Sequence, residues 1–419
     1  MKLIHTAVLW VVMGVATPVG LLADETPAPP GPATDQQLMD KVKQLEQRVA
    51  ELEGKGAPPA APANVSMPQK TLDFLGQTEI SGFVSASYLF NFSDPDNSTV
   101  AGRGFDGRNN TFNLNKFKLM LENPVDASGE KWDAGFRADL IFGQDAGLIQ
   151  SFNAGGPGTF NIGSNGDLEQ VFVQFNVPIG NGLIVKAGKM VTLMGVEVIE
   201  EVANPNWSVG NQFLYVENFT QTGLLLSYKW NDKIDTQLAV FNGWDQLADN
   251  NRDKSFMGRI GLTIDDKTSV AVLGYGGPEQ TSNNHSKRYG AEIVGNRKLA
   301  DKFNSYIQLD YGNEEDLVGA NSDWEAAGLW LTYDFTEHVG LALRGDYLRD
   351  KDGVRAVPAY IVFVVPPKEL TSLTLTLNAK PVANLQIRPE IRWDHSSAET
   401  ALNGHQDQFT AGVGVAYLY

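Results

Sequence analysis

The sequence predicts an all-β protein: a transmembrane antiparallel β-barrel of about 16 strands, preceded by a short coiled-coil helix. Three observations support this prediction. From residue 78 to the carboxyl terminus, apolar residues alternate with polar or small ones, as in strands with one buried face. The connections alternate between tight turns and long loops, as in bacterial outer-membrane barrels. Beyond the amino terminus no apolar run reaches the roughly 18 residues of a membrane-spanning helix.

Composition narrows the possible functions. The 419 residues include 33 Lys and Arg against 50 Asp and Glu, a formal net charge of −17. This acidic balance argues against nucleic acid as a partner, because a protein that binds nucleic acid needs a basic face. The absence of cysteine excludes disulfides, thiolate metal sites and cysteine nucleophiles. The five histidines lack the spacing of metal ligands, so we expect no metal and no cofactor.

The first 23 residues are predicted to be a secretory signal peptide. Lys2 precedes an apolar stretch over residues 3–16, and the first carboxylates are Asp24 and Glu25. An uncleaved membrane anchor is the alternative, which the short length disfavours. Export without cysteine is typical of the bacterial cell envelope, so we expect the bacterial cell outer membrane as the location.

Residues 24–34 are proline-rich and are expected to be disordered, because proline fixes φ and lacks an amide donor. A helix is predicted over residues 35–54. Its leucines and valines recur at spacings of four and three, which is the seam of a coiled coil. We expect it in the periplasm, where it oligomerises; the alternative is a solitary amphipathic helix or a disordered segment. Residues 55–74 form a Pro/Ala-rich linker, and residues 75–419 form the barrel.

Sixteen strands are predicted in this last region, each long enough for a tilted strand to cross a bilayer. The predicted ranges are 78–92, 111–123, 131–143, 167–177, 183–193, 221–231, 233–244, 254–264, 267–276, 288–297, 302–313, 324–335, 338–348, 369–380, 384–395 and 408–419.

Aromatic residues near the turns distinguish a membrane barrel from a soluble β-sandwich, because they form an interfacial girdle. These residues are Tyr228, Trp230, Tyr333, Phe335, Tyr417 and Tyr419. Two features fit less well. Pro389 interrupts a strand and predicts a local bulge. The apolar segment 359–365 could extend a strand, fold over the rim or contact a neighbouring subunit.

A barrel of sixteen strands is wide enough for a water-filled channel. Strand parity places basic residues on the lumen wall, where charges are hydrated. They are Lys118, Arg137, Lys186, Lys229, Arg259, Arg344, Arg388 and Arg392. The loop over residues 194–220 contains four glutamates and no basic residue: Glu197, Glu200, Glu201 and Glu217. If it folds inward, these acids face the basic wall across a constriction and create a transverse field. The alternative is an extracellular loop with solvated acids.

The residues after the fifth predicted strand carry a family resemblance. Gly188-Lys189 precedes Gly195, Glu197 and Ile199, and Thr222-Gly223 follows. This stretch resembles the OmpL-like beta-barrel porins, and the resemblance implies an outer-membrane porin over residues 75–419. The final aromatic, Tyr419, is similar to the signal that the outer-membrane assembly machinery recognises. Most porins of this size are trimers, so we expect a homotrimer surrounded by outer membrane lipid.

Other functions have weaker support in the sequence. A barrel enzyme would need Ser and His within hydrogen-bond reach of each other, and His395 has no marked partner. We therefore expect no enzyme and no catalytic residues. A structural tether through the periplasmic helix, or a barrel sheath around a partner protein, remains the alternative. The preferred prediction is a porin that passes small hydrophilic solutes or ions by passive diffusion, narrowed by the 194–220 loop.

Overall fold

The computed structural model describes residues 35–54, 69–93, 95, 98–149, 165–355, 363 and 365–419. The chain divides into two units, Met1–Pro68 and Gln69–Tyr419. In the first unit the described part is one helix, α1 (Asp35–Gly54), over the range that the sequence predicts. None of the described helices combines the length and hydrophobicity needed to span a bilayer. The predicted signal peptide, proline-rich segment and most of the linker lie outside the described residues.

The second unit begins with helix α2 (Gln69–Gln77) and continues into sixteen strands. The strands are β1 (Glu79–Asn91), β2 (Thr111–Asn123), β3 (Asp133–Phe142), β4 (Gly166–Val177), β5 (Leu183–Val191), β6 (Thr220–Lys229), β7 (Ile234–Phe241), β8 (Ser255–Asp265), β9 (Thr268–Gly277), β10 (Arg288–Ala300), β11 (Phe303–Glu314), β12 (Ser322–Asp334), β13 (Val339–Asp350), β14 (Glu369–Val382), β15 (Leu385–Ser396) and β16 (Asp407–Leu418). Three short helical turns lie in the connections: α3 (Ala146–Ile149), η1 (Glu201–Ala203) and α4 (Asn211–Tyr215).

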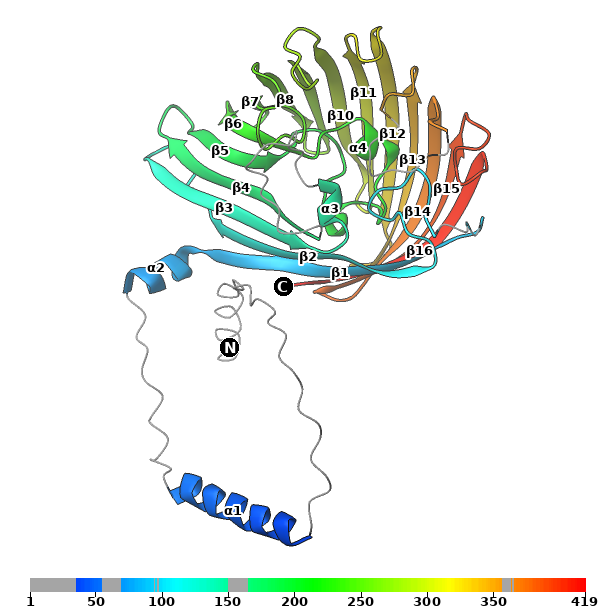
Figure 1. Ribbon diagram of the computed structural model, residues 1–419. Helices are drawn as coiled ribbons and strands as arrows, with labels where there is room; N and C mark the ends of the chain where they lie inside the picture. Colours follow the sequence, from blue (N-terminus) through cyan, green and yellow to red (C-terminus); the bar gives the residue numbers. More distant parts are fainter. Residues whose placement is uncertain are drawn as a thin grey trace. The chain divides into compact units, whose positions relative to one another are not determined.

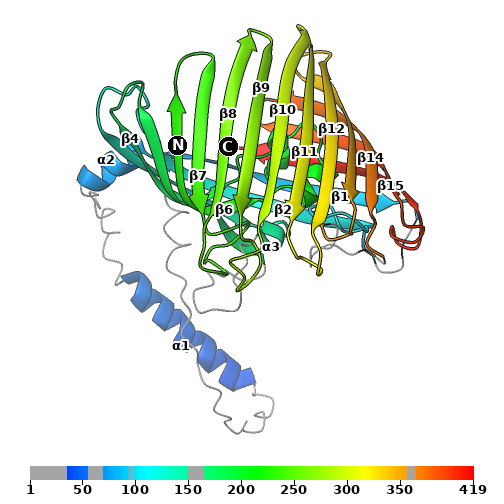
Figure 2. The same ribbon diagram turned by 90° about the horizontal axis from the view of Figure 1, so that it is seen from above.

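Each strand pairs with its sequence neighbours in antiparallel order, and β1 pairs with β16 to close the barrel. Figures 1 and 2 show this ring of tilted strands from two directions. The carboxyl terminus completes the closure, because Tyr419 and Gly82 exchange two backbone hydrogen bonds of 3.0 Å. Closure leaves no open sheet edge, which a membrane requires because lipid offers no hydrogen-bond partners. The predicted fold is therefore confirmed.

All sixteen predicted strands are present, with ends within three residues of the predicted ones. One prediction about local structure is wrong: the linker was expected to extend to residue 74, but its last residues belong to α2. The irregularity predicted near Pro389 occurs on one side of β15 only. Pro389 lies opposite Val413 in the regular register of β15 and β16. On the other side, the pairing of β14 with β15 is interrupted between Thr376 and Ala379 and shifts register between Ala379 and Val382.

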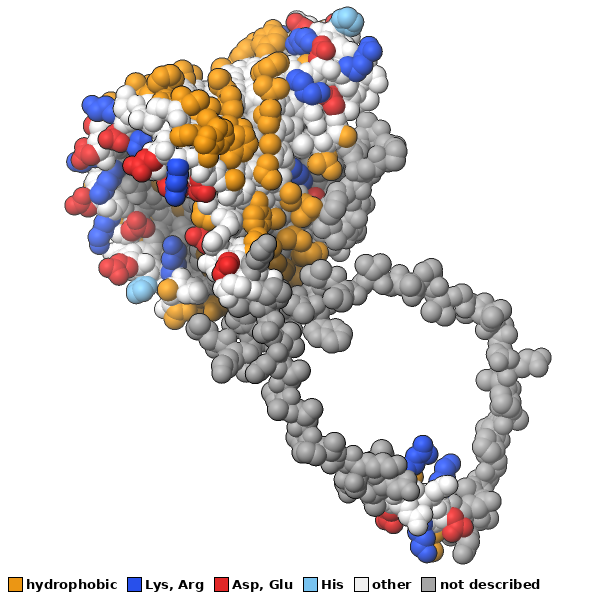
Figure 3. Space-filling model, turned by 90° about the vertical axis from the view of Figure 1, so that its left-hand side faces the viewer, with side chains coloured by type: hydrophobic (Ala, Val, Ile, Leu, Met, Phe, Trp, Pro, Cys, Tyr) orange, Lys and Arg blue, Asp and Glu red, His pale blue; other side chains and the backbone are white. Residues whose placement is uncertain are grey.

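The outer face of the barrel is apolar, as Figure 3 shows for one side. Outward side chains such as Leu238, Phe256 and Ile260 are at least half exposed in the isolated protein. In a membrane, lipid would cover them. Aromatic side chains pack near the short turns, where Tyr228 meets Trp230 at 4.8 Å and Tyr333 meets Phe335 at 5.1 Å between ring centroids. The predicted aromatic residues at the turn end are thus grouped as an interfacial girdle requires.

The interior is packed at the end with the long connections. Residues of α3, of α4 and of the strand walls form one apolar cluster there, which includes Phe213, Tyr215 and Trp324. Phe363 packs against Tyr215, with ring centroids 6.2 Å apart. Phe363 belongs to the apolar segment 359–365, whose position the sequence left open, and it faces inward. The other residues of this segment, except Val365, lie outside the described residues.

Candidate functional site: the loop inside the barrel

The connection between β5 and β6, residues 192–219, enters the lumen and carries η1 and α4 (Figure 1). We refer to these residues as the lumen loop. Its residues from Asn206 to Phe219 are all buried, although they belong to no strand. Because a loop carries backbone groups that strands do not satisfy, the wall has to supply hydrogen-bond partners for it. Inward side chains from several parts of the wall do so.

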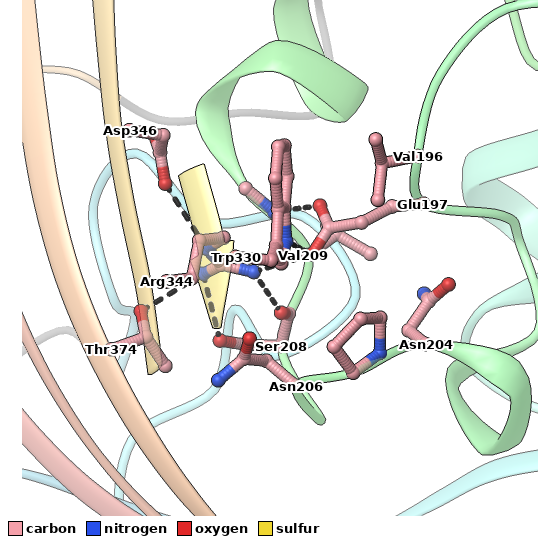
Figure 4. A network of polar contacts seen from close by, with 12 residues as sticks. Val196, Glu197, Asn204, Asn206, Ser208, Val209, Trp330, Arg344, Asp346 and Thr374 are labelled. Carbon is pink, nitrogen blue, oxygen red and sulfur yellow. Dashed lines mark hydrogen bonds and ion pairs between the residues drawn. The ribbon is translucent and has the colours of Figure 1, made fainter. Parts of the chain in front are cut away.

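Arg344 on β13 is the centre of the most extensive contact (Figure 4). Its guanidinium lies 2.7 Å from Glu197 and 3.1 Å from Asp346, and it donates to the carbonyl oxygen of Ser208 and to Thr374. Glu197 also accepts a hydrogen bond of 2.6 Å from the backbone amide of Gly210. Arg344 is fully buried, and its charge needs these partners because an unpaired buried charge is very costly. The network therefore ties two distant points of the lumen loop to one place on the wall.

A second contact joins the loop to β2. Lys116 forms an ion pair with Glu201 and donates to the carbonyl oxygen of Ile199 at 2.8 Å. Lys118, two residues along the same face, forms an ion pair with Glu200. Both lysines are buried.

Three carboxylates around Lys118 resemble a metal-ligand set. Asp139, Glu169 and Glu200 each offer an oxygen atom within 4.8 Å of the others. The Lys118 ammonium nitrogen lies 3.0 Å from Asp139 and 3.2 Å from Glu169, so a protein cation already balances this charge. The three carboxylates and Lys118 thus form an internal ion-pair network.

Backbone groups of the loop are held by further wall residues. Glu390 on β15 accepts from the amides of Trp207 and Ser208, and Arg392 donates to the carbonyl oxygen of Val209 at 2.7 Å. Arg388 donates to three loop carbonyls, those of Glu201, Asn204 and Pro205.

On the neighbouring part of the wall, β10 and β11 hold the start of the loop. Glu292 accepts from the amide of Gly195 and Gln308 from that of Val196, each at 2.9 Å.

The contact with β6–β9 is different in kind. Met194 of the loop belongs to an apolar cluster with inward residues of these four strands: Leu225, Ala239, Met257 and Leu273. Phe172, Met190, Phe241, Trp244 and Tyr275 complete this cluster. Between the described residues of the lumen loop and strands β7, β8 and β9 there is no hydrogen bond and no ion pair. Strands β7, β8 and β9 therefore hold the loop by apolar packing alone, whereas Asp245, in the connection after β7, accepts a hydrogen bond from the amide of Phe219.

The structure places the predicted wall residues in two groups. Lys118, Arg344, Arg388 and Arg392 contact the lumen loop. Arg137, Lys186, Lys229 and Arg259 point elsewhere. Arg137 pairs with Asp139 and Glu122, Arg259 with Asp235 and Lys229 with Asp232, while Lys186 lies over the ring of Phe172 at 4.6 Å.

The loop acids do not face the basic wall across a gap, as the sequence led us to expect. Glu197, Glu200 and Glu201 touch wall cations directly, and Glu217 accepts a hydrogen bond of 2.7 Å from Gln308. Buried charges that approach one another in a space of low dielectric pair rather than remain apart, because the unpaired state is the costlier one. Sequence reasoning also missed Lys116, although it shares a strand face with Lys118. The alternation along the strand places Glu390 on the lumen face without indicating its contact with the loop, and nothing in the sequence indicated Met194.

The charge states of two loop acids differ. Burial opposes the ionisation of Glu200, but the attraction of Lys118 and a hydrogen bond with Glu169 outweigh it and lower the pKa of Glu200 to about 2. Burial and the neighbouring carboxylates Asp310 and Glu197 raise the pKa of Glu217 well above its usual value. Glu200 is therefore a carboxylate at neutral pH, whereas burial and the neighbouring carboxylates shift Glu217 toward its protonated form.

Residues 77–419 match the family model described as "Putative beta-barrel porin-2, OmpL-like". The chain belongs to this family of outer-membrane porins. No curated protein matches the sequence.

Several solved structures share the fold at low identity. The anion-selective porin from Comamonas acidovorans aligns with a TM-score of 0.58 and 10% identity, over 82% of this chain and 99% of that one. OprB from Pseudomonas putida gives 0.55 and 11%, over 84% and 96%. OmpT from Vibrio cholerae in its trimer form gives 0.53 and 12%, over 82% and 99%.

The porin fold puts the lumen loop at the place where any solute has to pass. Each of the sixteen strands contributes at least one inward side chain that is no more than 4% exposed, for example Ser85, Leu273 and Arg392. In the conformation described here, the loop and the wall together fill the middle of the porin's lumen.

Proposed function

We propose that this porin is a passive channel for small hydrophilic solutes or ions, and that the lumen loop is its constriction. The observation that carries the proposal is the position of the loop: its acids are bound to β2 and β13, on separate parts of the wall. A segment fixed at separate points across a lumen limits the size of what can pass. No bond is made or broken in the solute, so the protein needs no catalytic group.

The inward charges nearer the short turns are of both signs. The side chains of Arg137 and Glu122 are 25% and 22% exposed, and those of Arg259 and Asp235 are 27% and 47% exposed. Lys186 forms no direct ion pair among the described residues, although Glu122 attracts its charge. Such a vestibule of mixed charge accepts hydrated solutes.

We further propose a homotrimer in outer membrane lipid, with α1 in the periplasm. OmpT, which shares the fold, has a trimer form. The apolar seam of α1 is available for association, because Val42 and Leu45 are more than half exposed. Tyr419, as the last aromatic residue of the last strand, is the candidate contact for the assembly machinery. Its side chain is fixed by a 2.8 Å hydrogen bond to the carbonyl oxygen of Lys118.

Single-channel recording in a planar bilayer tests the channel function. We expect stable conductance steps from the purified protein, arriving in threes if the trimer is correct. A variant without residues 24–68 is the matched control, since α1 lies in a separate unit and is not expected to contribute to the pore. Removing these residues should leave the unitary conductance unchanged.

A barrel that conducts nothing under any condition would contradict the channel proposal. The filled middle of the lumen would then favour the second candidate function, a structural tether or a sheath for a partner protein, in which the barrel acts as an anchor. In that case deleting residues 24–68 should abolish attachment to the envelope partner.

A further inference from the structure

The wall of this porin grips the lumen loop in two ways. Toward β2 and toward β13–β15 the contacts are buried ion pairs and hydrogen bonds, such as those of Lys116, Arg344 and Arg392. Toward β7–β9 they are the apolar contacts around Met194. When a buried ion pair separates, water or other polar groups have to solvate both charges, because an unpaired buried charge is costly. An apolar contact can open without leaving any charge unpaired.

The side chain that the loop contributes to this contact is suited to movement. Methionine is unbranched and has three rotatable side-chain bonds, so it adopts new rotamers with little strain. Met257 on β8 shares this property, and the side chains of Leu273 and Ala239 in the same cluster carry no polar atoms. Met194 and the facing wall can therefore separate while the rest of the lumen loop stays bound.

Polar groups lie on both sides of the apolar contact. Along β8, Arg259 follows Met257 in the direction of the short turn, and its side chain is partly exposed and paired with Asp235. Beyond Trp244 and Tyr275, toward the long loops, Arg288 lies 4.7 Å from the Trp244 ring and pairs with Glu314 at 2.5 Å. A hydrated solute that follows these strands meets polar side chains before and after a short apolar barrier.

We propose that the permeation route of this porin runs along β7, β8 and β9, and that an apolar gate formed by Met194, Leu225, Met257 and Leu273 limits its conductance. The proposal rests on the channel function and specifies which residues determine passage. A narrow apolar segment in a pore excludes water until it widens, so it acts as a gate without any charged group. The loop acids then serve to fix the loop, whereas the gate controls the flow.

Cysteine modification tests the route, because the chain has no cysteine of its own. The pair to compare is Leu273→Cys in β9 and Leu348→Cys in β13. Both leucines face inward and are no more than 2% exposed. They also lie in one cross-strand row, through Glu292, Asp310 and Ala326. A cationic methanethiosulfonate reagent should reduce the current of Leu273→Cys by roughly half or more, because it places a charge in the gate. It should leave Leu348→Cys unaffected.

Equal inhibition of the two variants, or inhibition of Leu348→Cys alone, would overturn the proposed route while the channel function stands. A failure of the reagent to change the current of Leu273→Cys would do the same.

A polar substitution tests the gate independently of chemical modification. Leu273→Ser should raise the unitary conductance or the open probability at least about twofold, because it wets the apolar barrier. Leu348→Ser should not. If the wild-type protein gives no current and Leu273→Ser conducts, the gate is supported and explains the missing wild-type current. If both are silent although circular dichroism shows folded barrels, the gate and the channel function fail together.

Discussion

The walls on the two sides of the lumen loop differ in how they hold it. On β13, Arg344 is fully buried and is bound by Glu197, Asp346, Ser208 and Thr374 at once. On β7–β9 the loop meets Ala239, Met257 and Leu273, which offer no hydrogen bond. Hydrogen bonds and ion pairs are directional and fix one geometry, whereas apolar contact is non-directional and depends on area. One loop can therefore be rigidly placed on one side and free to yield on the other.

The largest effect is expected from breaking the rigid side. Arg344→Gln leaves Glu197 and Asp346 without their cation in a buried place. Removing one partner of a buried ion pair costs about 3–5 kcal/mol. We expect a loss of this size in the free energy of unfolding, measured by urea titration of the folded barrel in lipid vesicles.

Arg259→Gln is the matched control for this measurement. Arg259 also faces inward and pairs with an acid, Asp235, but both side chains are partly exposed. The expected cost is below about 1 kcal/mol, as for other solvated pairs. A cost at Arg344 that is no greater than the cost at Arg259 would remove the distinction between the two sides of the loop.

A smaller effect is expected on ion selectivity. Glu200→Gln removes an ionised carboxylate whose side chain is 19% exposed, while Lys118 keeps Asp139 and Glu169 as acidic partners. The reversal potential under a potassium chloride gradient should shift by several millivolts toward the chloride equilibrium potential. Neutralising Glu197 and Glu201 as well should increase the shift, provided that the loop remains in place.

Glu217→Gln supplies the comparison for Glu200. The two changes have the same shape and formal charge, but the raised pKa of Glu217 means that glutamine replaces a group that is shifted toward its neutral form. We expect an unchanged reversal potential. A shift at Glu217 equal to that at Glu200 would show that the two acids have the same charge state at neutral pH.

The smallest effect concerns the end of the loop that adjoins β6. Asp245 accepts from the amides of Phe219 and Thr220, each at 2.8 Å, and burial raises its pKa from 3.8 to about 6. Between about pH 4 and pH 6 the folded state retains a proton that the unfolded state has lost. This residue therefore makes the free energy of unfolding fall as the pH rises through that window.

Asp245→Asn keeps the acceptor oxygen and removes the titration. The difference in unfolding free energy between variant and wild type should grow by up to about 1–2 kcal/mol in favour of the variant from pH 4 to pH 6, at about 1.4 kcal/mol per pKa unit. Unfolding titrations at several pH values measure this difference. A constant difference across that range would contradict the assignment.

Much of the barrel could be predicted because its strands obey a local rule. A residue such as Leu238 or Phe256 faces lipid while its neighbours face the lumen, and this alternation is visible along the chain. The contacts of the lumen loop could be predicted only in part. Its acidic character and its length indicated a function. Lys116 could also have been predicted, because it lies two residues before Lys118 on the same face of β2. Nothing near Met194 in the sequence pointed to Leu273, which lies almost eighty residues away.

The sequence by itself determined the barrel, its strand count, the outward apolar face and the family to which the chain belongs. The period of two follows from the geometry of a strand, and the turns follow from residues such as Gly129 and Gly180, whose positive φ values suit tight turns. The tertiary structure decided that the loop acids pair with the wall instead of facing it, and which side of the loop is held without charges. These features depend on which side chains meet across the lumen, and the distance and dielectric at such contacts exist only after the barrel has closed.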